Sequence, residues 1–142
     1  MAAAAEEWSL MRHHTVTVGV ELKQYGEQKV LEVSLKDDVI ERFSLGLVLL
    51  REQVVDTLSL GGKSTRLDIR VADEQHVDLP ADKYEPRIAR CWLSPEPLSS
   101  LLHFCLRYYA TRVIQVDHVD LEMSDGREDY YLTFALCGTR GT

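Results

Sequence analysis

The chain has 142 residues, of which 45% are hydrophobic and 27% charged, which suits one folded domain and excludes wholesale disorder. Apolar runs such as Leu47 to Leu50 are too short to span a membrane, so we expect no membrane association. Sixteen Lys and Arg against 23 Asp and Glu give a net charge of −7, which argues against a nucleic-acid partner because phosphate neutralisation is the main source of non-specific affinity.

The three cysteines indicate a reducing compartment. Their number is odd and the sequence contains no Cys-x-x-Cys pair, so it indicates no disulfide framework and we expect a cytoplasmic location. The first ten residues lack the positive start and the longer apolar core of a signal peptide. We expect a tail or short helix over 1–12, a single α+β domain over 13–137 and a tail over 138–142.

The first predicted element is a β-hairpin. Apolar and polar residues alternate over 15–22 and again over 31–36, which is the period of half-buried strands. Between these segments, Gly26 occupies the first central position of a four-residue turn, as a type II′ turn requires. This turn places three apolar pairs on one face: Leu22 with Leu31, Val20 with Val33 and Val18 with Leu35.

The spacing then changes to that of an amphipathic helix, within residues 37–60. Two starts are open, because Asp38 with Glu41 resembles a capping box and Ser44 is an alternative N-cap. The double glycine that follows residue 60 predicts the end of the helix. Its apolar positions are Leu47, Leu50, Val54, Val55 and Leu58.

A strand, a long loop, another strand and a second helix follow. Alternating apolar residues predict strands at 67–71 and 87–93, and the polar stretch 73–86 between them predicts a loop. Ser94 and Pro95 mark the start of the second helix. The predicted apolar face of this helix consists of Leu98, Leu101, Leu102, Cys105 and Tyr109, widened by Phe104 and Tyr108.

The last predicted unit is a second hairpin, around the Asp125-Gly126 pair that favours a type I′ turn. Apolar residues before position 117 have the opposite parity from those after it, which predicts a β-bulge near Asp117-His118. The two-residue turn predicts two apolar pairs on one face: Leu121 with Tyr130 and Val119 with Leu132.

The order of predicted elements is ββαββαββ. Because tight turns join neighbouring strands, we expect an antiparallel sheet built largely from hairpins, with the two helices packed on one face. The sequence therefore predicts the α+β fold class.

The second hairpin also supplies the main candidate site. If its apolar residues face the core, polar side chains share the opposite face, and Glu122 lies opposite Asp129. Like charges across a strand pair are unfavourable unless something offsets them. A basic partner, a divalent cation or Arg127 would do so, whereas a solvated charged face is the plain structural interpretation. The candidate partner or ligand face comprises His118, Asp120, Glu122, Asp129 and Tyr131.

The 73–86 loop supplies further candidates, because long loops are either functional or mobile. Its spacing does not match the pattern of a calcium loop, and it has no glycine for the sharp turn. The Gly-Gly-Lys-Ser segment at 61–64 follows a predicted helix, whereas a phosphate loop precedes one. We expect no metal site, cofactor or catalytic residue. The loop candidates are His76, Asp78 and Asp82.

These features predict a small, soluble, acidic, non-catalytic protein-binding or regulatory module, with a protein partner and a homodimeric state. One version neutralises a basic protein, because an acidic surface attracts a basic one. The alternative is a small-molecule- or metal-binding domain, or an enzyme, that uses the polar face of the second hairpin. A subunit of a larger complex is a third hypothesis.

Overall fold

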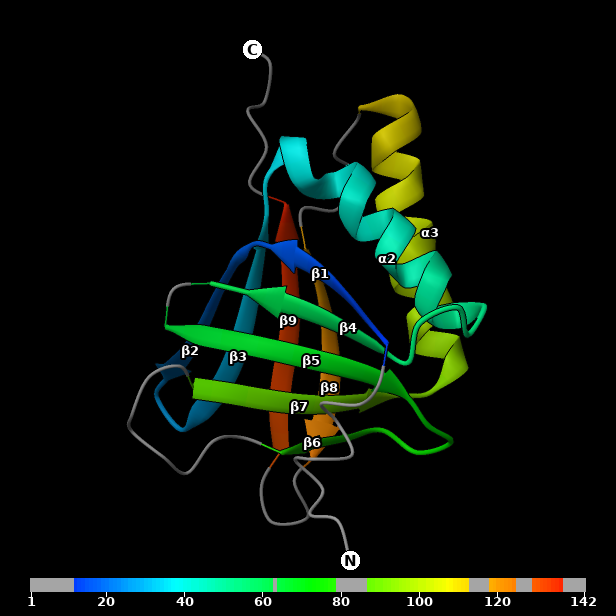
Figure 1. Ribbon diagram of the computed structural model, residues 1–142. Helices are drawn as coiled ribbons and strands as arrows, with labels where there is room; N and C mark the ends of the chain where they lie inside the picture. The colour runs from blue at the N-terminus through cyan, green and yellow to red at the C-terminus, as the bar shows by residue number, and fades with distance from the viewer. Residues whose placement is uncertain (1–11, 63, 79–86, 113–117, 125–128, 137–142) are drawn as a thin grey trace, which may run out of the picture.

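The computed structural model describes residues 12–62, 64–78, 87–112, 118–124 and 129–136, which form two β-sheets and two α-helices (Figure 1). The five-stranded sheet contains, in spatial order, β1 (His13–Thr17), β4 (Thr57–Gly61), β5 (Thr65–Val71), β7 (Arg87–Leu93) and β6 (His76–Asp78). The four-stranded sheet contains β2 (Gly19–Tyr25), β3 (Gln28–Leu35), β9 (Asp129–Leu136) and β8 (His118–Ser124). The helical segments are the 3₁₀ turn η1 (Asp37–Val39) and the helices α2 (Ile40–Arg51) and α3 (Pro95–Thr111).

The two sheets face each other, and their strands run across one another (Figure 1). Their inner faces bury each other, so the core consists of the alternate apolar residues of both sheets. The helices add their apolar sides, and the Phe43 ring of α2 stacks on the Phe134 ring of β9 at a centroid distance of 5.5 Å. The largest fully buried side chains include Phe43, Phe134, Leu35, Leu47, Leu58, Leu67, Ile69 and Leu98.

The α+β class is confirmed, but both sheets are mixed. The pairs β1–β4, β5–β7 and β3–β9 are parallel, and the other pairs are antiparallel. The predicted order ββαββαββ also omits strands, because β1 and β2 are separate and β4 and β6 were not expected. Turns determine how neighbouring strands pair, but they do not determine how two distant hairpins join.

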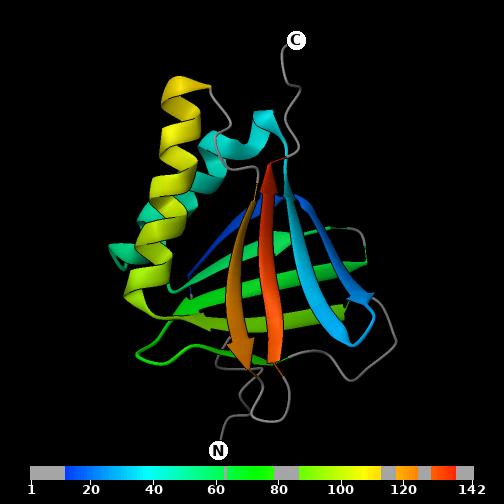
Figure 2. The same ribbon diagram turned by 180° about the vertical axis from the view of Figure 1, so that it is seen from behind.

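The helices do not cover one sheet face as expected. They lie next to each other along one side of the two sheets, as the front and back views show (Figures 1 and 2). Helix α2 packs mainly against β1, β4 and β5 of the five-stranded sheet, whereas α3 packs against β8 of the four-stranded sheet. Since the two sheets already cover each other's inner faces, the helices bury their apolar sides between the sheets at this side.

The first hairpin follows the predicted register. Val20 pairs with Val33 and Leu22 with Leu31, and Gly26 has φ = +63°, as the first central position of a type II′ turn requires. The expected Val18–Leu35 pair is not part of this register. Val18 lies between β1 and β2, where its amide donates a 2.9 Å hydrogen bond to the Gly61 carbonyl and the chain passes from one sheet to the other.

Helix α2 is shorter than predicted, because it ends at Arg51 and the chain then forms β4. Gln53 adopts φ = +61° in the connection, and all of residues 57–60 are buried. The helical start is also different. The η1 turn leads into α2 without a side-chain cap, and Ser44, the alternative N-cap, is a buried residue within the helix.

The strands and the helix predicted between residues 67 and 111 are largely confirmed. Strands β5 and β7 and helix α3 are present, with Pro95 in the first turn of α3, although the Ser94 side chain makes no capping hydrogen bond. The expected loop contains β6, which pairs with β7. Tyr108 is buried and Tyr109 is 42% exposed, so their predicted roles are exchanged. The expected bulge and the expected tails, apart from Arg12, lie largely outside the described residues.

No helix within the described part of the chain is both long and apolar enough to cross a membrane.

Candidate functional site

The second hairpin has a different register from the predicted one. Asp120 lies opposite Thr133 and Glu122 lies opposite Tyr131, two residues away from the expected pairing. Ser124 lies opposite Asp129, whereas the predicted two-residue turn at Asp125-Gly126 would place it opposite Arg127. Because the displacement is even, each side chain keeps its predicted face.

The new register removes the like-charge pair from which the sequence analysis inferred a divalent cation or a basic partner. Glu122 does not oppose Asp129, which instead lies opposite Ser124. Within this hairpin, Asp120 and Glu122 each have a neutral neighbour across the strands. Asp120 accepts a 2.6 Å hydrogen bond from the Thr133 hydroxyl, and Glu122 accepts a weaker one of 3.4 Å from the Tyr131 hydroxyl.

The parallel β3–β9 pairing joins the two hairpins into one polar surface. Glu32 of β3 lies beside Thr133 of β9, which lies beside Asp120 of β8, so these side chains form one row across the sheet. We call the outward side of the four-stranded sheet the acidic face. Its described charged groups are the carboxylates of Glu21, Glu32, Asp120, Glu122 and Asp129 and the ammonium of Lys23, with the His118 imidazole beside them.

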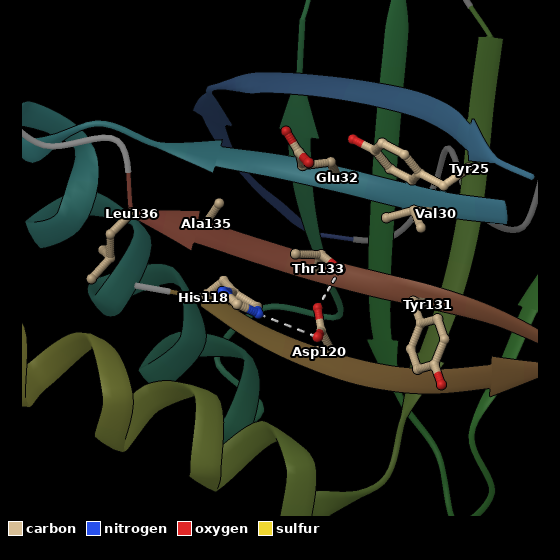
Figure 3. A pocket seen from close by; sticks show the side chains of 9 residues that line it. All are labelled: Tyr25, Val30, Glu32, His118, Asp120, Tyr131, Thr133, Ala135 and Leu136. Atoms are coloured by element: carbon tan, nitrogen blue, oxygen red, sulfur yellow. Dashed lines mark hydrogen bonds and ion pairs between the residues drawn. The ribbon is translucent and has the colours of Figure 1, made fainter. Parts of the chain in front are cut away.

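A shallow hollow of about 370 Å³ lies on the acidic face (Figure 3). Two residues on this outward face, Val30 and Thr133, are only 8% and 9% exposed, so their larger neighbours cover them. The side chain of Ala135 is small and leaves room above the sheet. Among the described residues, those that line it are Tyr25, Val30, Glu32, His118, Asp120, Tyr131, Thr133, Ala135 and Leu136.

The hollow has an aromatic end and a carboxylate centre. Figure 3 shows Tyr25 and Tyr131 at one end, with His118 and Ala135 toward the other. Tyr25 is 58% exposed, a large fraction for an aromatic side chain. Near the middle, the His118 imidazole lies 3.5 Å from the Asp120 carboxylate. This arrangement offers flat apolar surfaces next to negative charge.

Two pKa shifts indicate that the potential over this face is negative. The Lys23 ammonium donates a 2.9 Å hydrogen bond to Glu32, and this bond together with the Glu32 charge raises the pKa of Lys23. The negative charge of Glu122 raises the pKa of Tyr131. In both cases carboxylates stabilise the more positive form of their neighbour, and they would stabilise a bound cation in the same way.

The site lacks the arrangement that a metal centre needs. Among the described residues, no three His, Cys, Asp or Glu side chains converge on one point. His118 and Asp120 supply two such groups, and the hydroxyl of Thr133 between the carboxylates is already donated to Asp120. Recognition of an organic cation by carboxylates and aromatic rings is the chemistry that these residues favour.

The loop candidates lie elsewhere. His76 and Asp78 belong to β6 of the five-stranded sheet. The centroids of the His76 and Trp92 rings lie 5.4 Å apart, and Asp78 lies opposite Arg90 in the register of β6 and β7. The structure therefore does not bring them to the acidic face, and Asp82 lies outside the described residues.

Sequence reasoning missed the half of the site that the first hairpin supplies. Tyr25, Val30 and Glu32 line the hollow, and Lys23 neutralises part of its charge. The alternation of apolar and polar residues along the first hairpin was visible in the sequence, but the parallel pairing of β3 with β9 was not.

Comparisons with protein-family models, curated proteins and solved structures found no match to this chain. The function must therefore be inferred from the geometry and charge of the site.

Proposed function

We propose that this chain is a non-catalytic protein-binding module that holds cationic side chains of a basic partner on its acidic face. The observation that supports this proposal is the concentration of charge: five carboxylates and one lysine among the described residues of one sheet face, around a hollow. Neutralisation of a basic protein, such as an enzyme whose substrate is anionic, is the regulatory role that this surface suits.

The row from Glu32 through Thr133 to Asp120 suits one cationic group. Neighbouring strands are about 4.8 Å apart, so the Cα atoms of Glu32 and Asp120 are separated by roughly 10 Å. A guanidinium or ammonium above Thr133 would lie between the two carboxylates. Its aliphatic stem would contact Val30, and its charge would face the tyrosine rings at the end of the hollow.

The proposed location is the cytoplasm. Cys91 and Cys105 are free thiols within the folded core, which fits a reducing compartment.

An NMR titration of the ¹⁵N-labelled full chain tests the binding proposal. The probe is the peptide acetyl-Ala-Arg-Ala-amide, and acetyl-Ala-Glu-Ala-amide is its matched control. We expect the arginine peptide to shift the amide signals of Glu32, Asp120 and Thr133, with weaker binding as salt rises. The glutamate peptide should leave these signals unchanged.

Two double variants with the same change of charge show whether the site is specific. Glu32→Gln with Asp120→Asn should abolish the shifts, whereas Asp73→Asn with Glu74→Gln should retain them, because Asp73 and Glu74 are exposed on the β5–β6 connection. Equal weakening by both variants, or shifts spread evenly over the surface, would contradict a site at the hollow.

The volume of the hollow favours one alternative occupant. At about 370 Å³, it lies within the range of small-molecule sites, so a free organic cation is the second candidate. Methylguanidinium in the same titration distinguishes the two. If it binds as tightly as the arginine peptide, the peptide backbone contributes nothing and a small-molecule ligand is favoured over a protein.

A further inference from the structure

The two helices form a second surface of a different kind, an apolar groove that we call the helix groove. Three large apolar side chains on its walls are exposed: Leu45 by 50%, Leu106 by 44% and Tyr109 by 42%. The groove has a volume of about 300 Å³ and is lined by Glu41, Ser44, Leu45, Val48, Leu106 and Tyr109.

The exposure of these residues follows from how each helix is buried. Helix α3 turns Leu98, Leu101, Leu102, Cys105 and Tyr108 inward, which leaves Leu106 and Tyr109 on its flank. On α2, Leu45 likewise lies outside the buried side of the helix. Single exposed apolar residues are ordinary on a protein surface, but three that gather around one groove indicate a contact surface.

We propose that a second copy of this chain occupies the helix groove, which makes the protein a homodimer. The groove has one acid from α2, Glu41, and one base at its border on α3, Arg112, whose guanidinium lies 5.2 Å from the Tyr109 ring centroid. Arg112 already pairs with Asp37 at 2.7 Å, but a guanidinium has further N–H donors for a second carboxylate.

The opposite charges on the two helices make the surface complementary to itself. Asp37 precedes α2 and Arg112 follows α3, so their ion pair places the start of α2 beside the end of α3. A two-fold axis along the groove would lay α2 of each copy on α3 of the other, with Glu41 near Arg112 of the partner and the apolar side chains between them.

A dimer at the helix groove is also compatible with the charge of the molecule. Two chains of net charge −7 repel each other, most strongly through their acidic faces. The helices lie along the side of the sheets and leave the outward side of the four-stranded sheet open (Figure 2). This inference therefore does not depend on the proposed function, and a dimer would present two hollows to a partner, which increases the avidity for a basic surface.

Light scattering after size-exclusion chromatography tests the proposal over an about 100-fold range of concentration. We expect the mass of the full chain to rise from 16.2 kDa toward twice that value as concentration increases. Leu106→Glu should keep the mass at that of the monomer at every concentration. Val54→Glu is the matched control, because Val54 is 51% exposed but is not part of the groove.

A charge variant tests the self-complementary arrangement. Glu41→Arg would oppose Arg112 of the partner, so we expect it to weaken dimerisation about tenfold. Circular dichroism melts of all variants check that the monomer remains folded. A wild-type chain that stays monomeric throughout, a dimer that survives Leu106→Glu, or equal loss in Val54→Glu would overturn the proposal.

Discussion

The hydroxyl of Tyr108 in α3 donates a 2.8 Å hydrogen bond to Oδ1 of Asp37, a residue 71 positions earlier at the start of the η1 turn. The same oxygen accepts a 2.7 Å hydrogen bond from the Arg112 guanidinium. Both donors lie at the end of α3, and their acceptor precedes α2. These contacts therefore fasten the two helices together, and they hold the walls of the helix groove in place.

Tyr108→Phe removes the hydroxyl and keeps the ring. We expect it to lower the free energy of unfolding by about 1–2 kcal/mol, because a partly buried hydrogen bond to a carboxylate is lost while Arg112 still pairs with Asp37. Guanidinium denaturation at a concentration where the chain is monomeric measures the change. Tyr109→Phe is the control, since Tyr109 is 42% exposed. An equal loss of unfolding free energy in both variants would show that the hydrogen bond to Asp37 does not cause the loss.

The same hydrogen bond predicts a pH dependence. Because the neutral Tyr108 hydroxyl donates to Asp37, this bond, followed by burial, raises the pKa of Tyr108 above the ordinary tyrosine value of about 10. A group whose pKa is higher in the folded state stabilises that state fully below its unfolded pKa, and this contribution is lost as pH rises through the folded pKa. The difference in unfolding free energy between wild type and Tyr108→Phe should be constant near neutral pH and shrink above about pH 10. A difference that grows above that pH would have the wrong sign.

Gly46 of α2 is required by close packing. A Cβ atom at this position would lie 2.6 Å from Cδ1 of Leu58 and 3.0 Å from Cδ2 of His14, and Leu58 is fully buried. Alanine favours a helix over glycine by about 1 kcal/mol, but overpacking costs about 1–3 kcal/mol. We therefore expect Gly46→Ala to lower the thermal midpoint. Gly61→Ala, where the nearest atom is 4.0 Å away, should not, and a stabilised Gly46→Ala would show that the core adjusts freely.

Local patterns predicted the elements whose pairing depends on a nearby turn. The β2–β3 register followed from Gly26 and from alternation, because both constraints act within a few residues. Helix α3 followed from Pro95 and its apolar spacing. Strand β4 was missed because Val54, Val55 and Leu58 have helical spacing by coincidence, while Gln53 turns the chain and Leu58 and Leu60 face the core of the five-stranded sheet.

The candidate site was predicted in part, for the same reason. Parity alone places Asp120, Glu122 and Tyr131 on one outward face, and a register error of two residues does not change it. The contribution of Glu32 required knowing that β3 and β9 are parallel neighbours. About one hundred residues separate these strands, and no turn connects them directly, so only the burial of both sheets' inner faces determines that pairing.

The cysteines should be inert in the folded protein. Burial raises the pKa of Cys105 to about 12 and the pKa of Cys91 further still, so neither thiol is ionised near neutral pH, and both are almost fully covered. In a Cys137→Ser variant, which removes the thiol outside the described residues, iodoacetamide at about pH 8 should label neither residue until denaturant is added. Rapid labelling of the folded variant would show that the core opens.

The register of the second hairpin can be tested by cross-strand cysteines. Glu122 lies directly opposite Tyr131, where Cβ atoms are about 4.5–5.5 Å apart, close to the distance that a disulfide needs. The type I′ turn predicted from the sequence would instead place Glu122 opposite Asp129, a diagonal pair about 7–8 Å apart in this structure. We expect the pair Glu122→Cys with Tyr131→Cys to close under oxidised glutathione, and Glu122→Cys with Asp129→Cys to remain reduced, as intact mass would show. Faster closure of the second pair would mean that the hairpin turns at Asp125-Gly126, as the sequence predicted. Asp120 would then lie beside Tyr131 and would not form a row with Glu32 and Thr133. The proposed binding site for a cationic side chain would therefore not exist.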